Sequence, residues 1–230
     1  MPDTDRTDLP VYVLLHGVYG SAWAWALKGG AHRTAAGLVA AGSIGPAVVA
    51  MPSDGLWGDG SAYSAHDDRR FDRWIADDVL RAVRENVPAA ADGAAACLGG
   101  LSMGGYGALR LGALYADRFR AVSGHSSITR LAEMAQFVEE PLAAYRADTA
   151  YPDVIDAIRS CGDRLPRLRF DCGTEDPLIG GNRRLHAELT AAGIRHDYAE
   201  YPGGHSWAYW AEHVSATLRF FDRAVRAADG

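Results

Sequence analysis

The chain has 230 residues, which predicts one domain, and its hydrophobic content of 48% and charged content of 23% are typical of a globular protein. The net charge of −6 gives no reason to expect nucleic acid or an anionic membrane surface as a partner. No stretch approaches the roughly 20 apolar residues of a membrane span, the polar start lacks the features of a signal peptide, and three cysteines without metal-ligand spacing predict reduced thiols in a cytoplasmic protein.

Apolar runs and amphipathic patterns alternate along the chain. The apolar runs predict buried strands at residues 11–15, 47–51, 94–98, 119–123, 168–173 and 194–201. Helical patterns occupy residues 34–41, 71–87, 106–114, 182–192 and 206–227. Strands that alternate with helices predict an α/β fold in which both faces of a mostly parallel sheet are covered.

The first predicted strand runs into a turn that contains glycine, at residues 16–20. In open α/β sheets the carboxyl ends of the strands are the places where ligands bind. His16 is expected to shape this turn. Residues 21–33, which include Trp23 and Trp25, predict a loop over the edge of the sheet.

The motif Gly100-x-Ser102-x-Gly104 lies between the third predicted strand and the helix that follows it. This context is typical of a nucleophile elbow, in which a serine stands on a sharp, strained turn. Neighbouring side chains would collide on such a turn, and the two glycines remove them. The positive end of the helix favours developing negative charge at the site. The motif predicts Ser102 as a nucleophile, and the alternative is a glycine-rich turn that contains serine by chance.

Residues 130–160 have the least regular pattern in the chain, mixed and partly helical. We expect a small insertion there that lies over the site. The rest of the pattern predicts a single domain of residues 1–230.

A serine hydroxyl becomes a good nucleophile only when a base, usually histidine, takes its proton. Of the eight histidines, His205 lies in a loop after the last predicted strand, at the same edge of the sheet as Ser102. We therefore predict His205 as the base. His125 follows the strand after the elbow helix, so it could line the pocket.

The imidazole also needs an acid to orient it. Asp176 is the predicted acid, because it lies beyond the end of a strand and precedes Pro177, which holds it extended. Glu175 and Asp171 remain alternatives, and a turn cap is another interpretation of Asp176.

The reaction also requires two backbone N–H groups that bind the developing oxyanion. One is predicted at Met103, directly after the nucleophile, and the other at Val18 or Tyr19 in the turn after the first strand. No His-Glu-x-x-His helix or other compact ligand cluster occurs in the sequence, so metal-assisted hydrolysis is not expected.

These motifs resemble the α/β-hydrolase superfamily, and more narrowly the esterase group that includes S-formylglutathione hydrolase (esterase D), feruloyl and cinnamoyl esterases and mycolyl transferases. The matching segments span nearly the whole chain: Leu14-Leu15-His16-Gly17 with a following tryptophan, Met51-Pro52-Ser53-Asp54-Gly55, Gly100-Leu101-Ser102-Met103-Gly104-Gly105-Tyr106-Gly107-Ala108, Cys172-Gly173-Thr174-Glu175-Asp176 and Tyr201-Pro202-Gly203-Gly204-His205-Ser206-Trp207. The order Ser102, Asp176, His205 is also that of the superfamily.

The resemblance implies an α/β-hydrolase fold with Ser102, Asp176 and His205 as nucleophile, acid and base. The chain has no long insertion that would form a large cap, so none is expected. It implies acyl transfer to water through an acyl-serine, without a cofactor. The expected substrate is a small-to-medium ester or thioester. The alternatives are an acyltransferase or thioesterase of a biosynthetic pathway and a catalytically idle hydrolase fold used for binding.

The acyl pocket is expected to be lined by aromatic and histidine side chains near the predicted loops. The candidates, which could equally be core or surface side chains, are Tyr19, Trp57, His125 and Trp207.

Overall fold

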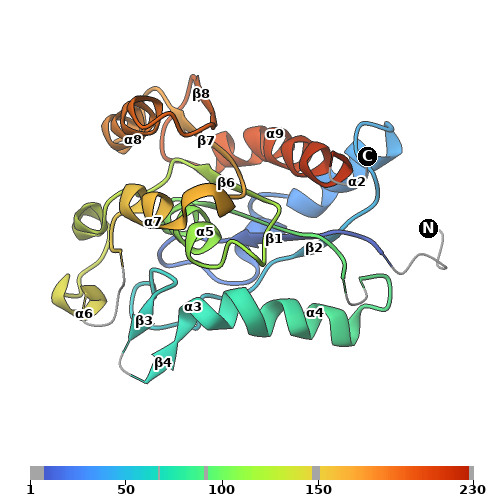
Figure 1. Cartoon of the computed structure of the whole chain (residues 1–230), viewed down its shortest axis with the longest axis horizontal. Coiled ribbons are helices and arrows are strands. Elements are labelled where there is room, and N and C mark those ends of the chain that lie inside the picture. The colour runs from blue at the N-terminus through green and yellow to red at the C-terminus, as the bar shows by residue number, and fades with distance from the viewer. Residues whose placement is uncertain (1–7, 67, 91–92, 147–150, 228–230) are drawn as a thin grey trace.

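A six-stranded parallel sheet forms the centre of the computed structural model, which describes residues 8–66, 68–90, 93–146 and 151–227 (Figure 1). The strand order is β2-β1-β5-β6-β7-β8, and every neighbouring pair in this sheet is parallel. The strands are β1 (Val11–Leu15), β2 (Val48–Ala50), β5 (Ala96–Leu101), β6 (Ala121–His125), β7 (Arg167–Gly173) and β8 (Asp197–Tyr201). The predicted α/β fold with a mostly parallel sheet is therefore confirmed.

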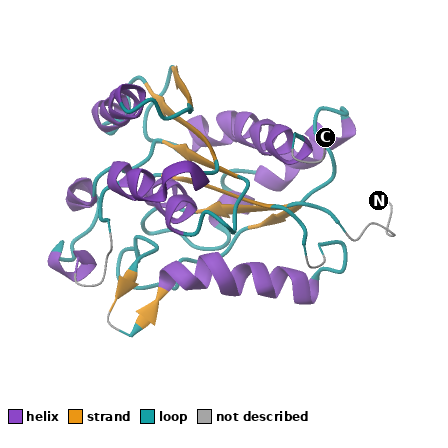
Figure 2. Ribbon diagram, viewed as in Figure 1, coloured by secondary structure: helices purple, strands orange, loops and turns teal. Residues whose placement is uncertain are grey.

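Helices flank both faces of the sheet (Figure 2). One face is covered by α1 (Ala24–Leu27), α2 (Ala31–Ala40) and α9 (Trp207–Arg226). The other face is covered by α5 (Met103–Leu114), α7 (Val154–Cys161), α8 (Ile179–Ala191) and a continuous helix made of α3 (Phe71–Arg73), a π-helical stretch (Trp74–Val79) and α4 (Leu80–Asn86). Among the described helices none is long and apolar enough to cross a bilayer.

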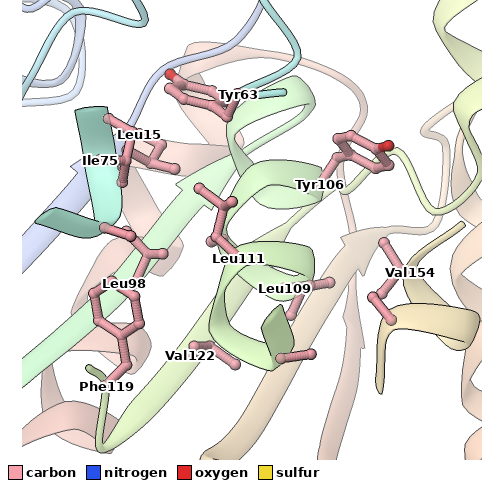
Figure 3. Packing of buried hydrophobic residues seen from close by; sticks show 14 of the residues in the cluster. Leu15, Tyr63, Ile75, Leu98, Tyr106, Leu109, Leu111, Phe119, Val122 and Val154 are labelled. Atoms are coloured by element: carbon pink, nitrogen blue, oxygen red, sulfur yellow. The ribbon is translucent and has the colours of Figure 1, made fainter. Parts of the chain in front are cut away.

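Alternate residues of the strands enter two separate hydrophobic cores, as the pleat of a strand requires. In β1, Val11, Val13 and Leu15 pack into the core on the α5 side, and Tyr12 and Leu14 pack into the core on the α9 side. Figure 3 shows the α5-side core, where side chains of β1, β5 and β6 meet α5. A strand buried on both faces explains why β1 is a continuous apolar run.

Several element boundaries differ from the prediction. The third strand begins at Ala96 and runs through Gly99 and Gly100 to Leu101, and α5 begins directly at Met103. The glycine run predicts a turn, but Gly99 and Gly100 belong to a strand that packs closely against the helices α9 and α5. A Cβ atom at Gly99 would lie 3.1 Å from the ring of Phe221.

Regular structure also occurs in segments where none was predicted. The predicted loop at residues 21–33 contains α1 and the beginning of α2. A small antiparallel pair, β3 (Ala65–His66) and β4 (Arg69–Arg70), precedes α3. Both segments are short, so their sequence periodicity is too brief to distinguish them from loop.

The segment at residues 130–160 is partly helical, as predicted. It contains 3₁₀ turns at Leu131–Gln136, the short helix α6 (Ala143–Arg146) and α7, which packs on α5. Residues 147–150 of the predicted insertion lie outside the described residues. A further 3₁₀ turn, Gly162–Arg164, leads from α7 into β7.

Candidate active site

Ser102 forms a sharp turn between β5 and α5. Its backbone has φ 53° and ψ −119°, a conformation that a residue with a side chain rarely adopts. The Ser102 N–H donates to the carbonyl of His125 at 2.9 Å, which fixes the turn to β6. The predicted elbow geometry is therefore present, and Ser102 is buried, with 2% of the residue's surface exposed.

The two glycines of the motif allow the turn. A Cβ atom at Gly100 would lie 2.2 Å from the carbonyl oxygen of Gly104, and one at Gly104 would lie 2.4 Å from the carbonyl oxygen of Leu15. Both distances are far below van der Waals contact. Only glycine at both positions lets α5 start directly beside the end of β1.

His205 lies in the loop between β8 and α9 and contacts Ser102. Its Nε2 atom is 3.0 Å from Ser102 Oγ, and its Nδ1 atom is 2.9 Å from Asp176 Oδ2. The His205 side chain is 19% exposed, whereas that of Asp176 is buried. The structure thus connects three loops, each at the carboxyl end of a different strand, in one chain of hydrogen bonds.

The donor and acceptor of each of these hydrogen bonds follow from which groups carry a proton. An ionised carboxylate only accepts hydrogen bonds, so we assign the imidazole proton to Nδ1. Nε2 is then an acceptor for the Ser102 hydroxyl. Asp176 is held in place because its Oδ1 atom also accepts the N–H of Leu178 at 2.8 Å.

The alternatives to Asp176 have other partners. Glu175 accepts the N–H of Gly203 at 2.7 Å, and its own N–H donates to the Gly203 carbonyl at 3.0 Å. These two bonds join the loop that carries Asp176 to the loop that carries His205. Asp171 is buried and bonds to His125. Among the described residues, Asp176 is the one acid that contacts the His205 ring.

Two aromatic residues enclose the imidazole of His205. The Phe137 ring stacks on it with 5.3 Å between ring centroids and an interplanar angle of 24°. The Trp210 ring meets it edge to face at 4.9 Å. Sequence analysis missed both residues: Phe137 lies in the irregular segment before α6, and Trp210 reads as an ordinary apolar position of α9.

The predicted oxyanion-binding turn lies directly against Ser102. A Cβ atom at Gly17 would lie 3.3 Å from Ser102 Cβ. The N–H of Tyr19 donates to the Asp59 carbonyl at 2.8 Å, whereas the N–H of Val18 has no acceptor among the described residues. As the first residue of α5, Met103 has an N–H without an intrahelical acceptor.

Two hydrogen bonds between Asp59 and the segment at residues 139–140 hold the loop that supplies the Asp59 carbonyl. The Asp59 N–H donates to Glu140 Oε1 at 2.9 Å, and the Glu139 N–H donates to Asp59 Oδ2 at 2.8 Å. These bonds link the loop after β2 to the segment that carries Phe137. The oxyanion-binding turn and the ring that stacks on His205 therefore share one support.

The residues predicted to line the acyl pocket have different positions. Trp57 is half-buried and stacks on His66, with 4.1 Å between ring centroids. Trp207 is half-buried and packs edge to face on Trp210, which itself meets His205. Tyr19 is largely exposed beside the turn. Contact of Trp57, Trp207 and Tyr19 with a substrate stays a prediction.

The prediction that His125 lines the pocket is wrong. Only 1% of His125 is exposed, and both ring nitrogens have partners inside the protein. Nδ1 lies 3.0 Å from Asp171 Oδ1, and Nε2 lies 2.8 Å from Thr217 Oγ1 on α9. The physical reason is that β6 extends to residue 125, so this side chain projects from the sheet into the α9-side core.

The buried Asp171 makes the stability of the fold depend on pH. Burial alone raises the pKa of this carboxyl, but His125, Arg169 and Tyr209 outweigh burial and hold it well below its usual value. A carboxyl with a depressed folded pKa stabilises the fold above its unfolded pKa of about 3.9, and this contribution disappears as the pH falls through the folded pKa.

We therefore expect Asp171→Asn to lower the free energy of unfolding by about 3 kcal/mol at neutral pH, because the Arg169 charge loses its partner. Urea unfolding between pH 3 and pH 8 checks this. The difference from the wild type should be constant above about pH 5 and shrink below about pH 4. A difference that grew toward low pH would contradict the depressed pKa.

The comparisons with known proteins agree with this geometry. A family model described as "Putative esterase" matches residues 1–221. The chain belongs to this esterase family. An acetyl esterase from Caldicellulosiruptor saccharolyticus is 26% identical over 96% of this chain and 86% of its own length. The family match identifies the protein as an esterase.

Solved structures show the same fold. A ferulic acid esterase superposes with a TM-score of 0.79 at 23% identity. The superposition covers 95% of the present chain and 86% of the ferulic acid esterase. An S-formylglutathione hydrolase from Staphylococcus aureus superposes with a TM-score of 0.78 at 18% identity, covering 96% and 87%. The family match confirms the predicted resemblance to the esterase group, and these superpositions show the fold. Among the described residues, no group of three or more His, Cys, Asp or Glu side chains is arranged to hold a metal ion.

Proposed function

We propose that the esterase hydrolyses carboxylic esters through an acyl-enzyme formed on Ser102. The observation that carries this proposal is the continuous chain of hydrogen bonds from Ser102 Oγ through His205 to the buried Asp176, at 3.0 Å and 2.9 Å. Such a chain activates a serine that would otherwise be a weak nucleophile. The strained elbow adds support, because strain of this kind persists where function needs it.

In the first half of the reaction Ser102 Oγ attacks the ester carbonyl carbon as His205 Nε2 takes the hydroxyl proton. The carbonyl oxygen becomes an oxyanion, which the N–H groups of Met103 and Val18 stabilise. The Tyr19 N–H is already bonded to Asp59, which favours Val18 of the two predicted donors. His205 then gives its proton to the leaving alcohol as the carbon–oxygen bond breaks.

In the second half a water molecule replaces the alcohol. His205 takes a proton from this water, the hydroxide attacks the acyl carbon, and Ser102 leaves with the proton from His205. Asp176 orients the ring in both halves and stabilises the imidazolium that forms. The products are a carboxylic acid and regenerated enzyme, and no cofactor takes part in any step.

A small-to-medium ester with a short acyl group is the proposed substrate. The acetyl esterase relative supports a short acyl group. The position of Phe137 against the His205 ring supports the same choice, because a side chain stacked there narrows the space beside the reacting atoms.

Trapping the acyl-enzyme tests the proposal. The wild type is mixed with p-nitrophenyl acetate and quenched in acid, and the intact mass is measured. One added acetyl group that maps to the Ser102 peptide, and is absent from Ser102→Ala, supports the acyl-serine. A wild type that releases p-nitrophenol without an acetylated peptide, or acetylates another residue, would overturn it. Hydrolysis rates for the acetate, butyrate and octanoate esters then measure the preferred acyl length.

A further inference from the structure

A cluster of six polar side chains is buried between the sheet and α9. They come from β6, β7 and α9, and none of the six residues is more than 6% exposed: Ser123, His125, Arg169, Asp171, Tyr209 and Thr217. The mechanism above uses none of these side chains. Burying so many polar groups is unfavourable unless each finds a partner, so the cluster calls for a physical explanation.

The carboxylate of Asp171 is the centre of this polar cluster. The Tyr209 hydroxyl donates to Oδ1 at 2.7 Å, and the His125 Nδ1–H donates to the same oxygen at 3.0 Å. Arg169 donates to Oδ2. One buried negative charge is thus paired with one buried arginine and two further donors, from β6 and α9.

Arg169 also donates to the hydroxyl oxygens of Ser123 and Thr217, at 3.3 and 3.4 Å. The hydrogen bonds that join Ser123, Thr217 and His125 run in one direction. With the His125 proton on Nδ1, its Nε2 accepts from the Thr217 hydroxyl at 2.8 Å, and Thr217 Oγ1 accepts from the Ser123 hydroxyl at 2.6 Å. The His125 Nδ1–H and the hydroxyls of Thr217 and Ser123 then each have an acceptor. A fully matched network of this kind holds its elements in one arrangement.

Each of the three catalytic loops is attached to this network. The carbonyl of His125 accepts the Ser102 N–H at 2.9 Å. Asp171 belongs to β7, the strand whose end leads to Asp176. Tyr209 lies in the first turn of α9, directly after the His205 loop.

Tyr209 has a second contact with the His205 loop. Its ring packs against Gly203, where a Cβ atom would lie 3.0 Å from Tyr209 Cδ2. Gly203 has φ 129°, a conformation that side chains rarely allow. The ring thus packs against the loop, and the hydroxyl fixes the ring to Asp171.

We propose that Tyr209, through its hydrogen bond to Asp171, is a positioning residue that holds His205 at the correct distance from Ser102. The inference rests on the proposed function, because it concerns the same histidine. Without the hydroxyl, the first turn of α9 loses its hydrogen bond to Asp171, and His205 is held less firmly at the Nε2–Oγ distance of 3.0 Å. Displacements of about 1 Å in an active site can lower a rate about a hundredfold.

Tyr209→Phe tests this inference, because it removes the hydroxyl and keeps the ring. A displaced His205 transfers protons poorly, and ethyl acetate needs a proton on its leaving group whereas p-nitrophenyl acetate does not. We expect kcat/KM to fall about a hundredfold for ethyl acetate and about tenfold for p-nitrophenyl acetate. Rates are expressed per site titrated with a phosphonate, so that unfolded protein does not count.

The matched control is Tyr115→Phe. The Tyr115 hydroxyl also donates to a carboxylate, that of Asp72, which is likewise paired with an arginine, Arg70. This pair lies at the carboxyl end of α5, and Ser102 lies at its amino end. The control should keep the wild-type ratio between the two esters.

The outcomes separate the positioning role from the proposed function. A larger loss for ethyl acetate in Tyr209→Phe alone supports the inference. Unchanged rates, an equal loss for both esters, or the same change in Tyr115→Phe would overturn it. If the wild type itself forms no acyl-serine, the proposed function fails, whatever Tyr209 does.

Discussion

Replacing Asp176 with asparagine is expected to lower kcat about ten-thousand-fold and to leave the fold intact. A comparable change in the serine proteases has an effect of about this size. The asparagine oxygen can still accept the Leu178 N–H, which Asp176 Oδ1 accepts at 2.8 Å. Its NH₂ group then faces His205 Nδ1 and favours the tautomer with the proton on Nε2. That tautomer cannot take the proton of Ser102.

The measurement is kcat for p-nitrophenyl acetate, with urea unfolding alongside. Asp163→Asn serves as the control, because Asp163 is exposed in the 3₁₀ turn after α7. It should leave kcat and the unfolding free energy unchanged, and Ser102→Ala supplies the residual rate. If Asp176→Asn keeps a kcat near that of the wild type, a different group orients His205 and the assigned acid is wrong.

The elbow could be predicted because its geometry restricts the residue types. Gly100 and Gly104 stand where a Cβ atom would overlap backbone atoms, so the sequence pattern reports a close approach of strand and helix. Asp176 and His205 were found for a related reason: each follows a strand, and the carboxyl ends of parallel strands meet at one edge of the sheet. The parallel order of the strands brings these loops together.

The position of His125 shows why side-chain direction is harder to predict. The predicted strand ended at residue 123, which placed His125 in a loop at the edge of the sheet. The observed strand, Ala121–His125, keeps it inside the sheet. Because side chains alternate between faces, a shift of two residues at the end of a strand decides whether a side chain reaches the loop region or the core.

Supports that join distant segments left no pattern in the sequence. Phe137 meets His205, Asp59 meets Glu140, and Tyr209 meets Asp171 through pairwise contacts with no periodicity of their own. One turn residue could not be assigned either, since the choice between Val18 and Tyr19 depends on the Asp59 carbonyl, which takes the Tyr19 N–H. Such contacts depend on how the loops pack, which a single sequence does not encode locally.

Gly104→Ala is expected to lower the free energy of unfolding by at least about 4 kcal/mol and kcat by at least about a hundredfold. The new methyl carbon would lie 2.4 Å from the Leu15 carbonyl oxygen and 2.6 Å from that of His16. Both are backbone atoms at the end of β1, so rotation of a side chain cannot relieve the overlap. The end of β1 must separate from α5, and the turn that carries Val18 moves away from Ser102.

Gly37→Ala is the matched control for this change. Gly37 is an exposed position inside α2, and a Cβ atom there would have no neighbour within 4 Å. Alanine is favoured over glycine within a helix by about 0.5–1 kcal/mol, so this variant should be slightly more stable than the wild type and equally active. Urea unfolding and kcat per phosphonate-titrated site measure both changes. If Gly104→Ala kept wild-type stability and kcat, the contact between α5 and β1 would not be what places the oxyanion-binding N–H groups around Ser102.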